Sequence, residues 1–167
     1  MAGMRIDPPV IAGEREMLVS WLEWHRATLA LKCAGLDREQ LVLRSVAPSN
    51  MSLLGLVRHM ADVERIWFRR VLAGEDAPGI WWTEEQPDGE WENVDPADPE
   101  EAFASWHAEC DFARRAVEEA PSLDVTGVRH GRDVSLRWIL VHMIEEYARH
   151  NGHADLLRER IDGSVGE

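Results

Sequence analysis

The chain contains little cysteine, with Cys33 and Cys110 the only two among 167 residues. Two thiols so far apart in the sequence are too few for a disulfide framework or a cysteine-rich metal site. Lone thiols on helices are usually small core residues, so we expect both to be buried rather than reactive.

Long apolar runs are also missing. No stretch approaches the roughly 18 apolar residues that a membrane span needs. Residues 1–16 contain no apolar segment long enough for a signal peptide. These two absences predict a cytoplasmic protein that has no membrane partner.

Positive charge is scarce, since 18 Lys and Arg residues face 31 Asp and Glu residues, for a formal net charge of −13. So acidic a surface is repelled by phosphate backbones and by anionic lipid. Nucleic acid is therefore excluded as a partner. Lys32 is the only lysine, and this preference for arginine, together with plentiful alanine, is typical of a GC-rich genome.

Apolar residues, in contrast, are plentiful enough for a real core. The chain is 45% hydrophobic and has eight tryptophans, and its length suits one domain over residues 1–167. Hydrophobic spacing predicts four long helices and little strand. They cover residues 13–33, 52–74, 99–120 and 135–160, with a short amphipathic piece at residues 37–46. This pattern favours an all-α four-helix bundle.

The connections between these helices are predicted to be irregular. Residues 75–98 are rich in proline, glycine and tryptophan, which predicts a long loop packed on the ends of the core. Residues 121–133 are predicted to form a second loop, with His130 in solvent. The helical tryptophans at apolar positions are expected in the core: Trp21, Trp67, Trp106 and Trp138.

The stretch HMIEEYARHNGH, residues 142–153, places three histidines and two glutamates in the last predicted helix. A helix advances about 100° per residue. On that wheel His150 lies in the middle of the apolar stripe, and Glu146 lies on the same side one turn earlier. Glu145 faces solvent. The helix therefore turns one carboxylate and one imidazole toward the bundle interior.

An inward carboxylate is costly unless it is paired or bound to a metal. Oxygen from Glu146 and nitrogen from His150 suit Zn²⁺ or a similar divalent ion. His59, on the rim of the apolar stripe of the second predicted helix, can supply a third ligand. Two simpler interpretations stay open: Glu146 can pair with an arginine of another helix, and His150 can be a hydrogen-bonded core residue.

Two further histidines, His142 and His153, flank the same stripe. They can orient the ligands or carry protons, or they can simply form hydrogen bonds at the rim of the bundle. Arg149 and Arg158 can bind a substrate carboxylate, although pairing with neighbouring acids is the simpler expectation. The sequence assigns no catalytic or substrate-binding residue.

Three stretches resemble one family. They are DPPVIAGEREMLVSWLEWHRATLALKCAGL, SLLGLVRHMADVERIWFRRVLAGE and VSLRWILVHMIEEYARHNGHADLLRERIDG. Together they are similar to the DinB-like superfamily of metalloenzymes, and most closely to its actinobacterial branch of mini-circle proteins. That branch is related to the N-terminal domain of mycothiol-dependent maleylpyruvate isomerase. The resemblance implies a four-helix bundle with a variant up-and-down topology.

The resemblance also implies a ligand set. Members of the superfamily hold a divalent metal with one histidine of the second helix and two ligands, four apart, of the last. The matching positions are His59, Glu146 and His150. In many members both ligands of the last helix are histidines, whereas the maleylpyruvate isomerase branch has Glu and His there, as this chain does. The implied cofactor is zinc first, with nickel, iron and manganese as alternatives.

Members with assigned activities use mycothiol, bacillithiol or glutathione. The first hypothesis is therefore a metal-dependent thiol S-transferase with mycothiol as cosubstrate and a small-molecule substrate. The second is a hydrolase or isomerase at the same metal, without a thiol. The third is a non-catalytic binding or dimerisation module, because homodimers are common among small bundles. Coordination of the metal by His142 or His153 as a fourth protein ligand would favour this third hypothesis.

Overall fold

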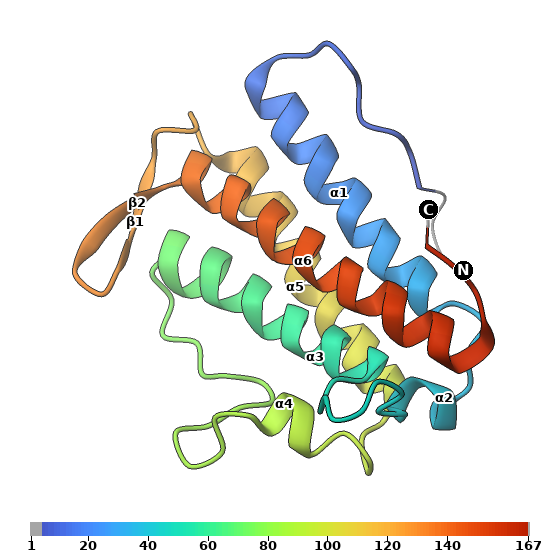
Figure 1. The fold of residues 1–167 in the computed structure, drawn as a ribbon. Helices are drawn as coiled ribbons and strands as arrows, with labels where there is room; N and C mark the ends of the chain where they lie inside the picture. The colour runs from blue at the N-terminus through green and yellow to red at the C-terminus, as the bar shows by residue number, and fades with distance from the viewer. Residues whose placement is uncertain (1–4, 167) are drawn as a thin grey trace.

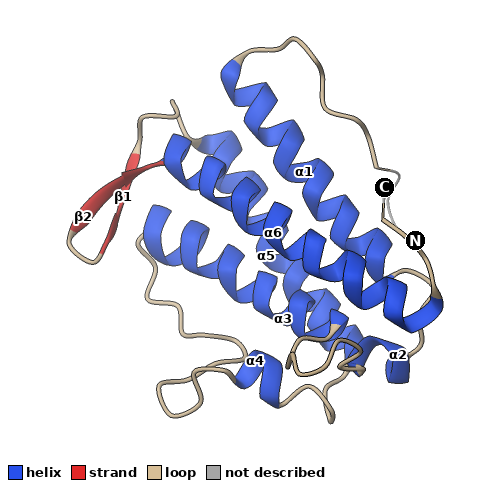
Figure 2. Ribbon diagram, viewed as in Figure 1, coloured by secondary structure: helices blue, strands red, loops and turns tan. Residues whose placement is uncertain are grey.

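The computed structural model describes residues 5–166 (Figure 1). Its long helices and short elements, in chain order, are α1 (Glu14–Cys33), α2 (Arg38–Val42), α3 (Leu53–Glu64), η1 (Arg65–Leu72), α4 (Gly89–Glu92), α5 (Pro99–Glu119), β1 (Thr126–Arg129), β2 (Arg132–Ser135) and α6 (Leu136–Asp162). Helix η1 continues α3 directly, so the long rods are α1, α3 with η1, α5 and α6. The predicted all-α bundle is confirmed (Figure 2).

The four rods pack in pairs. Helix α1 packs mainly against α6, and α3 packs mainly against α5. Figure 1 shows α6 running between α1 and α3, with α5 behind them. Side chains that α6 and α3 turn toward each other therefore meet across one seam of the bundle.

Local chemistry explains where the helices begin and end. The side chains of Ser52, Asp98 and Ser135 each accept a hydrogen bond from a backbone N–H of the following first turn, at 3.0, 2.9 and 3.2 Å. Such caps satisfy N–H groups that have no partner inside the helix. Gly163 ends α6 in the left-handed region at φ 81°, where glycine carries no steric penalty.

The second rod is not uniform. After Glu64 its turns widen to a π-helix over η1, and Ala73 N–H donates to Phe68 O at 3.0 Å. Wide turns of this kind are rare and are frequently found at functional sites. Here they change the direction in which the side chains after Glu64 point.

The core is fully enclosed. Met60, Phe68, Leu140 and Met143 have no exposed surface, and each such side chain contributes about 1.5–3 kcal/mol through burial. Within residues 5–166, no helix is long and apolar enough to cross a membrane.

Both cysteines lie in this core, as expected. Cys33 is 5% exposed and Cys110 is 1% exposed. Burial raises the pKa of the Cys33 thiol to about 12 and raises that of Cys110 still further. Neither thiol is ionised at neutral pH, so neither is a nucleophile.

Two of the four tryptophans predicted in the core are not there. Trp67 and Trp106 are 6% and 2% exposed, but Trp21 and Trp138 are 40% and 49% exposed. Trp138 stacks on the His142 ring with centroids 4.9 Å apart. An apolar stripe on a helical wheel does not say which of its edges a neighbouring helix covers, and these two rings lie on uncovered edges.

The prediction of a loop over residues 121–133 was wrong in part, because a β-hairpin occupies its second half. Strands β1 and β2 pair antiparallel, with Arg129 opposite Arg132. The two residues between them, His130 and Gly131, have φ values of 49° and 74°. Two consecutive positive φ values are typical of a type I′ hairpin turn. His130 is exposed at this turn, as expected.

Candidate metal centre

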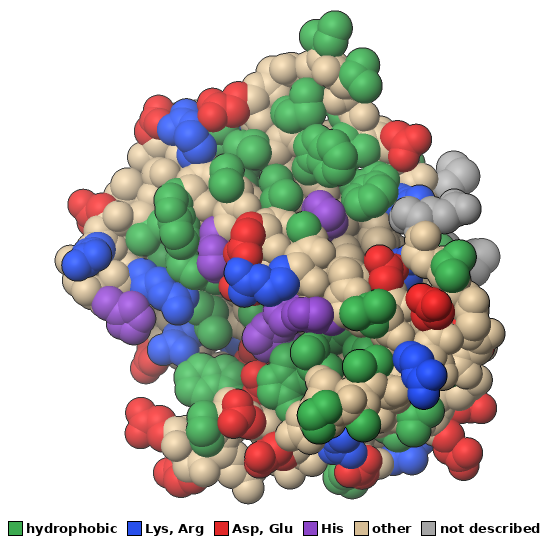
Figure 3. Space-filling view, viewed as in Figure 1, with side chains coloured by type: hydrophobic (Ala, Val, Ile, Leu, Met, Phe, Trp, Pro, Cys, Tyr) green, Lys and Arg blue, Asp and Glu red, His purple; other side chains and the backbone are tan. Residues whose placement is uncertain are grey.

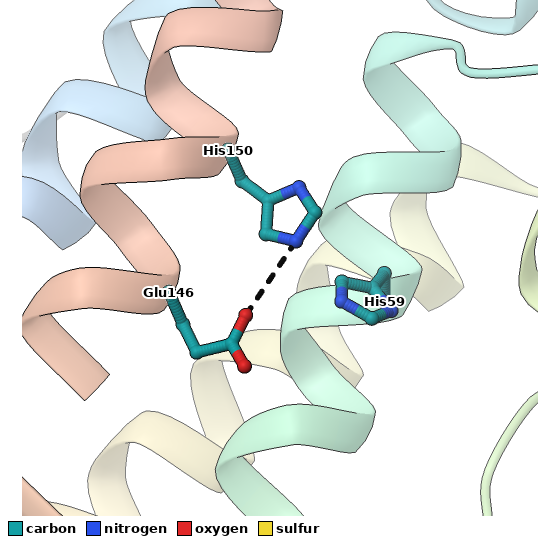
Figure 4. A group of neighbouring side chains, drawn as sticks. All are labelled: His59, Glu146 and His150. Carbon is teal, nitrogen blue, oxygen red and sulfur yellow. Dashed lines mark ion pairs between the residues drawn. The ribbon is translucent and has the colours of Figure 1, made fainter. Parts of the chain in front are cut away.

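The three predicted ligands come together. His59 projects from α3, and Glu146 and His150 project from α6, toward the space between the two helices (Figure 4). One donor atom of each residue lies within 4.8 Å of the others. His150 Nε2 is 3.6 Å from Glu146 Oε2, and the rings of His59 and His150 are 4.7 Å apart.

Helix geometry produces this arrangement. Residues four apart lie on one face of a helix, one turn from each other, so Glu146 and His150 both face α3. His150 is 9% exposed. Its pKa is lowered to about 3, first by burial and then by electrostatic interaction with His59, His153 and Arg149. At neutral pH its imidazole is therefore neutral and keeps a lone pair for a ligand.

Each α6 ligand also contacts a second histidine of α6. His142 Nε2 lies 3.1 Å from Glu146 Oε1, the carboxylate oxygen that does not face His150. His153 Nδ1 lies 3.3 Å from His150 Nδ1. The two flanking histidines thus contact the outer atoms of the candidate ligands, and leave Glu146 Oε2 and His150 Nε2 facing each other.

His59 has an outer partner that sequence reasoning missed. Glu90, on α4, is 7% exposed, and its Oε1 lies 3.3 Å from His59 Nδ1. Trp91, next along the chain, places its ring 5.0 Å from the His59 ring. No spacing in the sequence connects α4 with α3. The only signal was the concentration of tryptophan in residues 75–98, which predicted packing but not a carboxylate at the site.

A second group of acidic and imidazole side chains lies on α6 alone. His142, Glu145 and Glu146 also approach within 4.8 Å. The Glu145 side chain, however, is 46% exposed and pairs with Arg149, which is the surface pairing that the sequence predicted. Arg158 likewise pairs with Asp162, at 2.7 Å. The group with His59 is more buried and joins two helices, so it is the stronger metal candidate.

The donor spacing suits a small divalent cation. Tetrahedral ligands at about 2.0–2.1 Å from zinc lie roughly 3.3 Å from one another. The distance of 3.6 Å between His150 Nε2 and Glu146 Oε2 is close to that value. Two imidazoles and one carboxylate form a ligand set that leaves the fourth position to water or substrate.

A cleft opens beside Glu146. It has a volume of about 640 Å³ and is bordered by Trp67, Trp138 and His142 as well as by Glu146 itself. A cleft of that size accommodates a small organic molecule. Of the three candidate ligands, Glu146 is therefore the one that borders this cleft, on the side of the hairpin.

The comparison with protein families agrees with this architecture. A family model described as mycothiol-S-transferase matches residues 17–163. The matched span contains α1 through α6 almost entirely, and with them all three candidate ligands. A search of curated proteins found no match.

Proposed function

The chain belongs to the mycothiol-S-transferase family, and from that premise we propose that it joins mycothiol, or a similar small thiol, through its sulfur to an electrophile at a divalent metal. The proposed ligands are His59, Glu146 and His150, and zinc is the first candidate for the ion. The observation that carries the proposal is the approach of these three side chains to within 4.8 Å across the seam between α3 and α6.

The ligand set supports an open site. A cation held there would lower the pKa of a thiol and so supply a thiolate at neutral pH. His142 and His153 contact the outer atoms of Glu146 and His150. This arrangement supports a three-ligand catalytic site over a four-ligand structural one.

The residues around the site hold its donors in place before any ligand arrives. Each proposed ligand has one outer partner, and such partners fix ring orientation and tautomer. The pairs are His59 with Glu90, Glu146 with His142, and His150 with His153. The inner atoms of the ligands therefore need little reorganisation on binding.

The cleft beside Glu146 positions the electrophile. Its indole walls, Trp67 and Trp138, provide apolar contact for a small molecule. In a transfer to an alkyl halide, the sulfur electron pair forms the new S–C bond. The halide leaves with the bonding pair, and the thiol proton passes to water. Neither Cys33 nor Cys110 takes part, because both thiols are buried.

The first test is metal content. We expect the purified protein to carry about one equivalent of divalent metal at the proposed three-ligand site, measured by mass spectrometry, and His150→Ala to lose it. His107→Ala is the matched control, since His107 is an exposed histidine of α5. Equal metal content in the wild type and His150→Ala would remove the assigned site.

The second test is turnover. Mycothiol and a fluorogenic bimane halide should give the S-conjugate with the wild type and the His107→Ala control. Chelation should abolish the reaction while far-UV circular dichroism stays unchanged. Metal binding with ester hydrolysis but without thiol transfer would favour the hydrolase hypothesis. Metal binding without any turnover would favour the non-catalytic module.

A further inference from the structure

Arginines line the cleft on the side opposite the metal candidate. Arg129 of β1 and Arg132 of β2 border the same space as Glu146 and His142. Arg129 also borders an adjoining hollow of about 430 Å³, together with Arg70 of η1. Figure 3 shows basic and histidine side chains gathered on the left of this face, over the hairpin. In a chain with a formal net charge of −13, such a cluster is unexpected.

Acidic residues lie near these three arginines, since Glu146 borders the cleft and Glu75 and Asp76 border the adjoining hollow, but none is paired with them. Among residues 5–166, no carboxylate lies within ion-pair distance of Arg70, Arg129 or Arg132. Burial lowers the pKa of Arg129, the nearby charge of Arg70 lowers it further, and only Glu146 opposes them. A metal held by Glu146 would compete for that carboxylate. The cluster therefore places like charges together beside an accessible space.

The Arg129 side chain is held in position by an aromatic ring. Its guanidinium lies over the Trp67 ring at 4.2 Å from the centroid, a cation–π contact worth about 0.5–2 kcal/mol. Trp67 in turn contacts the His142 ring at 4.5 Å. The Trp67 ring thus lies between the guanidinium of Arg129 and the ring of His142, the histidine that contacts Glu146.

The hairpin that carries Arg129 is fixed against the bundle. A Cβ added to Gly127 would lie 1.9 Å from the backbone oxygen of Val71 in η1. Only glycine allows β1 to approach η1 so closely. Arg129 lies two residues further along β1, so its backbone cannot move freely away from the cleft.

We propose that this cleft binds the carboxylate of the second substrate, so that the electrophile is a small organic acid. Arg129 would receive the carboxylate, with Arg70 and Arg132 adding positive charge. The apolar part of the molecule would contact Trp67 and Trp138 and point its reactive carbon toward Glu146. The role in thiol transfer rests on the proposed function, whereas binding of the anion does not.

The test is anion preference in binding, without turnover. Trans-cinnamate and its neutral analogue trans-cinnamamide have nearly the same shape, and isothermal titration calorimetry gives Kd for both. We expect the wild type to bind cinnamate about tenfold more tightly, as for a charge-assisted hydrogen bond. Arg129→Gln should abolish that preference, Arg70→Gln should reduce it, and Arg129→Lys should retain part of it.

The control is Arg115→Gln, which removes the same charge from an exposed position on α5 and should leave the preference unchanged. The titrations are repeated after chelation, because a carboxylate can also bind a metal directly. If cinnamate loses its preference on chelation but not in Arg129→Gln, the proposal is overturned while the metal site stands. Equal affinity of the wild type for both compounds, no binding of either, or an equal effect of Arg115→Gln would also overturn it.

Discussion

Glu90 is a buried carboxylate that has only half of its acceptors satisfied. Its Oε1 contacts His59 Nδ1, but its Oε2 has no hydrogen-bond partner among residues 5–166. An unpaired buried oxygen of this kind costs about 1–3 kcal/mol. At a metal centre the same contact has a use, because a carboxylate that accepts from the outer nitrogen fixes the histidine tautomer and leaves Nε2 for the ion.

Replacing Glu90 with glutamine should therefore weaken metal binding without unfolding the protein. The amide is a poorer acceptor for the His59 ring, and loss of an outer partner reduces metal affinity by about 10–100-fold. Competition with a chromophoric chelator measures that affinity. Glu92→Gln, an exposed position on the same short helix α4, is the matched control. The same affinity in Glu90→Gln and the wild type would show that the contact does not position His59.

The residues of the site differ in how far the sequence could predict them. The helical wheel was enough to place His150 and Glu146 on an inward face, because both lie on one long helix with a clear apolar stripe. His59 was only on the rim of its stripe, and the family resemblance selected it. Glu90 was not predicted, because its contact with α3 depends on how the loop around the four-residue helix α4 folds. Hydrophobic periodicity along the sequence carries no information about that contact.

At the scale of elements, a buried carboxylate of α3 helps to attach residues 75–98 to the bundle. The Asp62 carboxylate of α3 accepts hydrogen bonds from the backbone N–H groups of Ile80 and Trp81, at 2.7 and 3.1 Å. Asp62 is 2% exposed. Burial raises its pKa to about 6, the two N–H groups oppose that rise, and the charge of Glu90 adds to it. The loop that carries Glu90 is thus attached through a titrating group.

This attachment predicts a pH dependence of stability. Between about pH 4 and pH 6 the folded state keeps a proton on Asp62 that the unfolded chain has already lost. The contribution of Asp62 to the free energy of unfolding should therefore fall as the pH rises through that window, by roughly 2–3 kcal/mol. Urea unfolding from pH 4 to pH 8 measures it. Asp62→Asn should lack this component, and identical pH profiles for the two proteins would contradict the assignment.

The hairpin shows why short elements escaped prediction. The segments TGVR and RDVS are four residues each, too short for an alternation to stand out. The His130–Gly131 pair was a usable signal, because a two-residue turn ending in glycine between short segments is typical of a hairpin. The strands nevertheless depend on tertiary packing, in particular on the close approach of Gly127 to Val71, and spacing along the chain does not encode that contact.

At the scale of the whole molecule, one buried polar network, centred on an ion pair, connects all four rods. Arg26 of α1 donates two hydrogen bonds to Glu64 of α3, at 2.8 and 2.6 Å. Tyr147 of α6 donates to the same carboxylate at 2.7 Å, and Trp106 of α5 donates to the tyrosine oxygen at 2.8 Å. Glu64 has no exposed surface. The overall bundle was predictable from helical periodicity, but this polar centre was not, because its members read as isolated residues on four separate segments.

A buried pair is far more costly to break than to replace. Arg26→Met leaves the Glu64 carboxylate buried without its cation, so the free energy of unfolding should fall by about 3–5 kcal/mol. Tyr147→Phe removes the hydroxyl that donates to Glu64 and accepts from Trp106, and should cost about 1–3 kcal/mol. The double variant Arg26→Met, Glu64→Leu removes both charges and should be more stable than Arg26→Met alone.

Denaturant unfolding at pH 7 measures all of these differences. Arg137→Met is the control for loss of an arginine, because Arg137 pairs with Glu14 at an exposed position, where an ion pair contributes about 0–1 kcal/mol. If the double variant were less stable than Arg26→Met, the cost would come from lost packing rather than from an unpaired charge. The polar centre would then stabilise the bundle by its shape alone. If the double variant recovers stability, the charges at the centre of the bundle are not needed for folding. Glu64 and Arg26 would then serve to fix the relative register of α1 and α3. The position of His59 opposite α6 depends on that register.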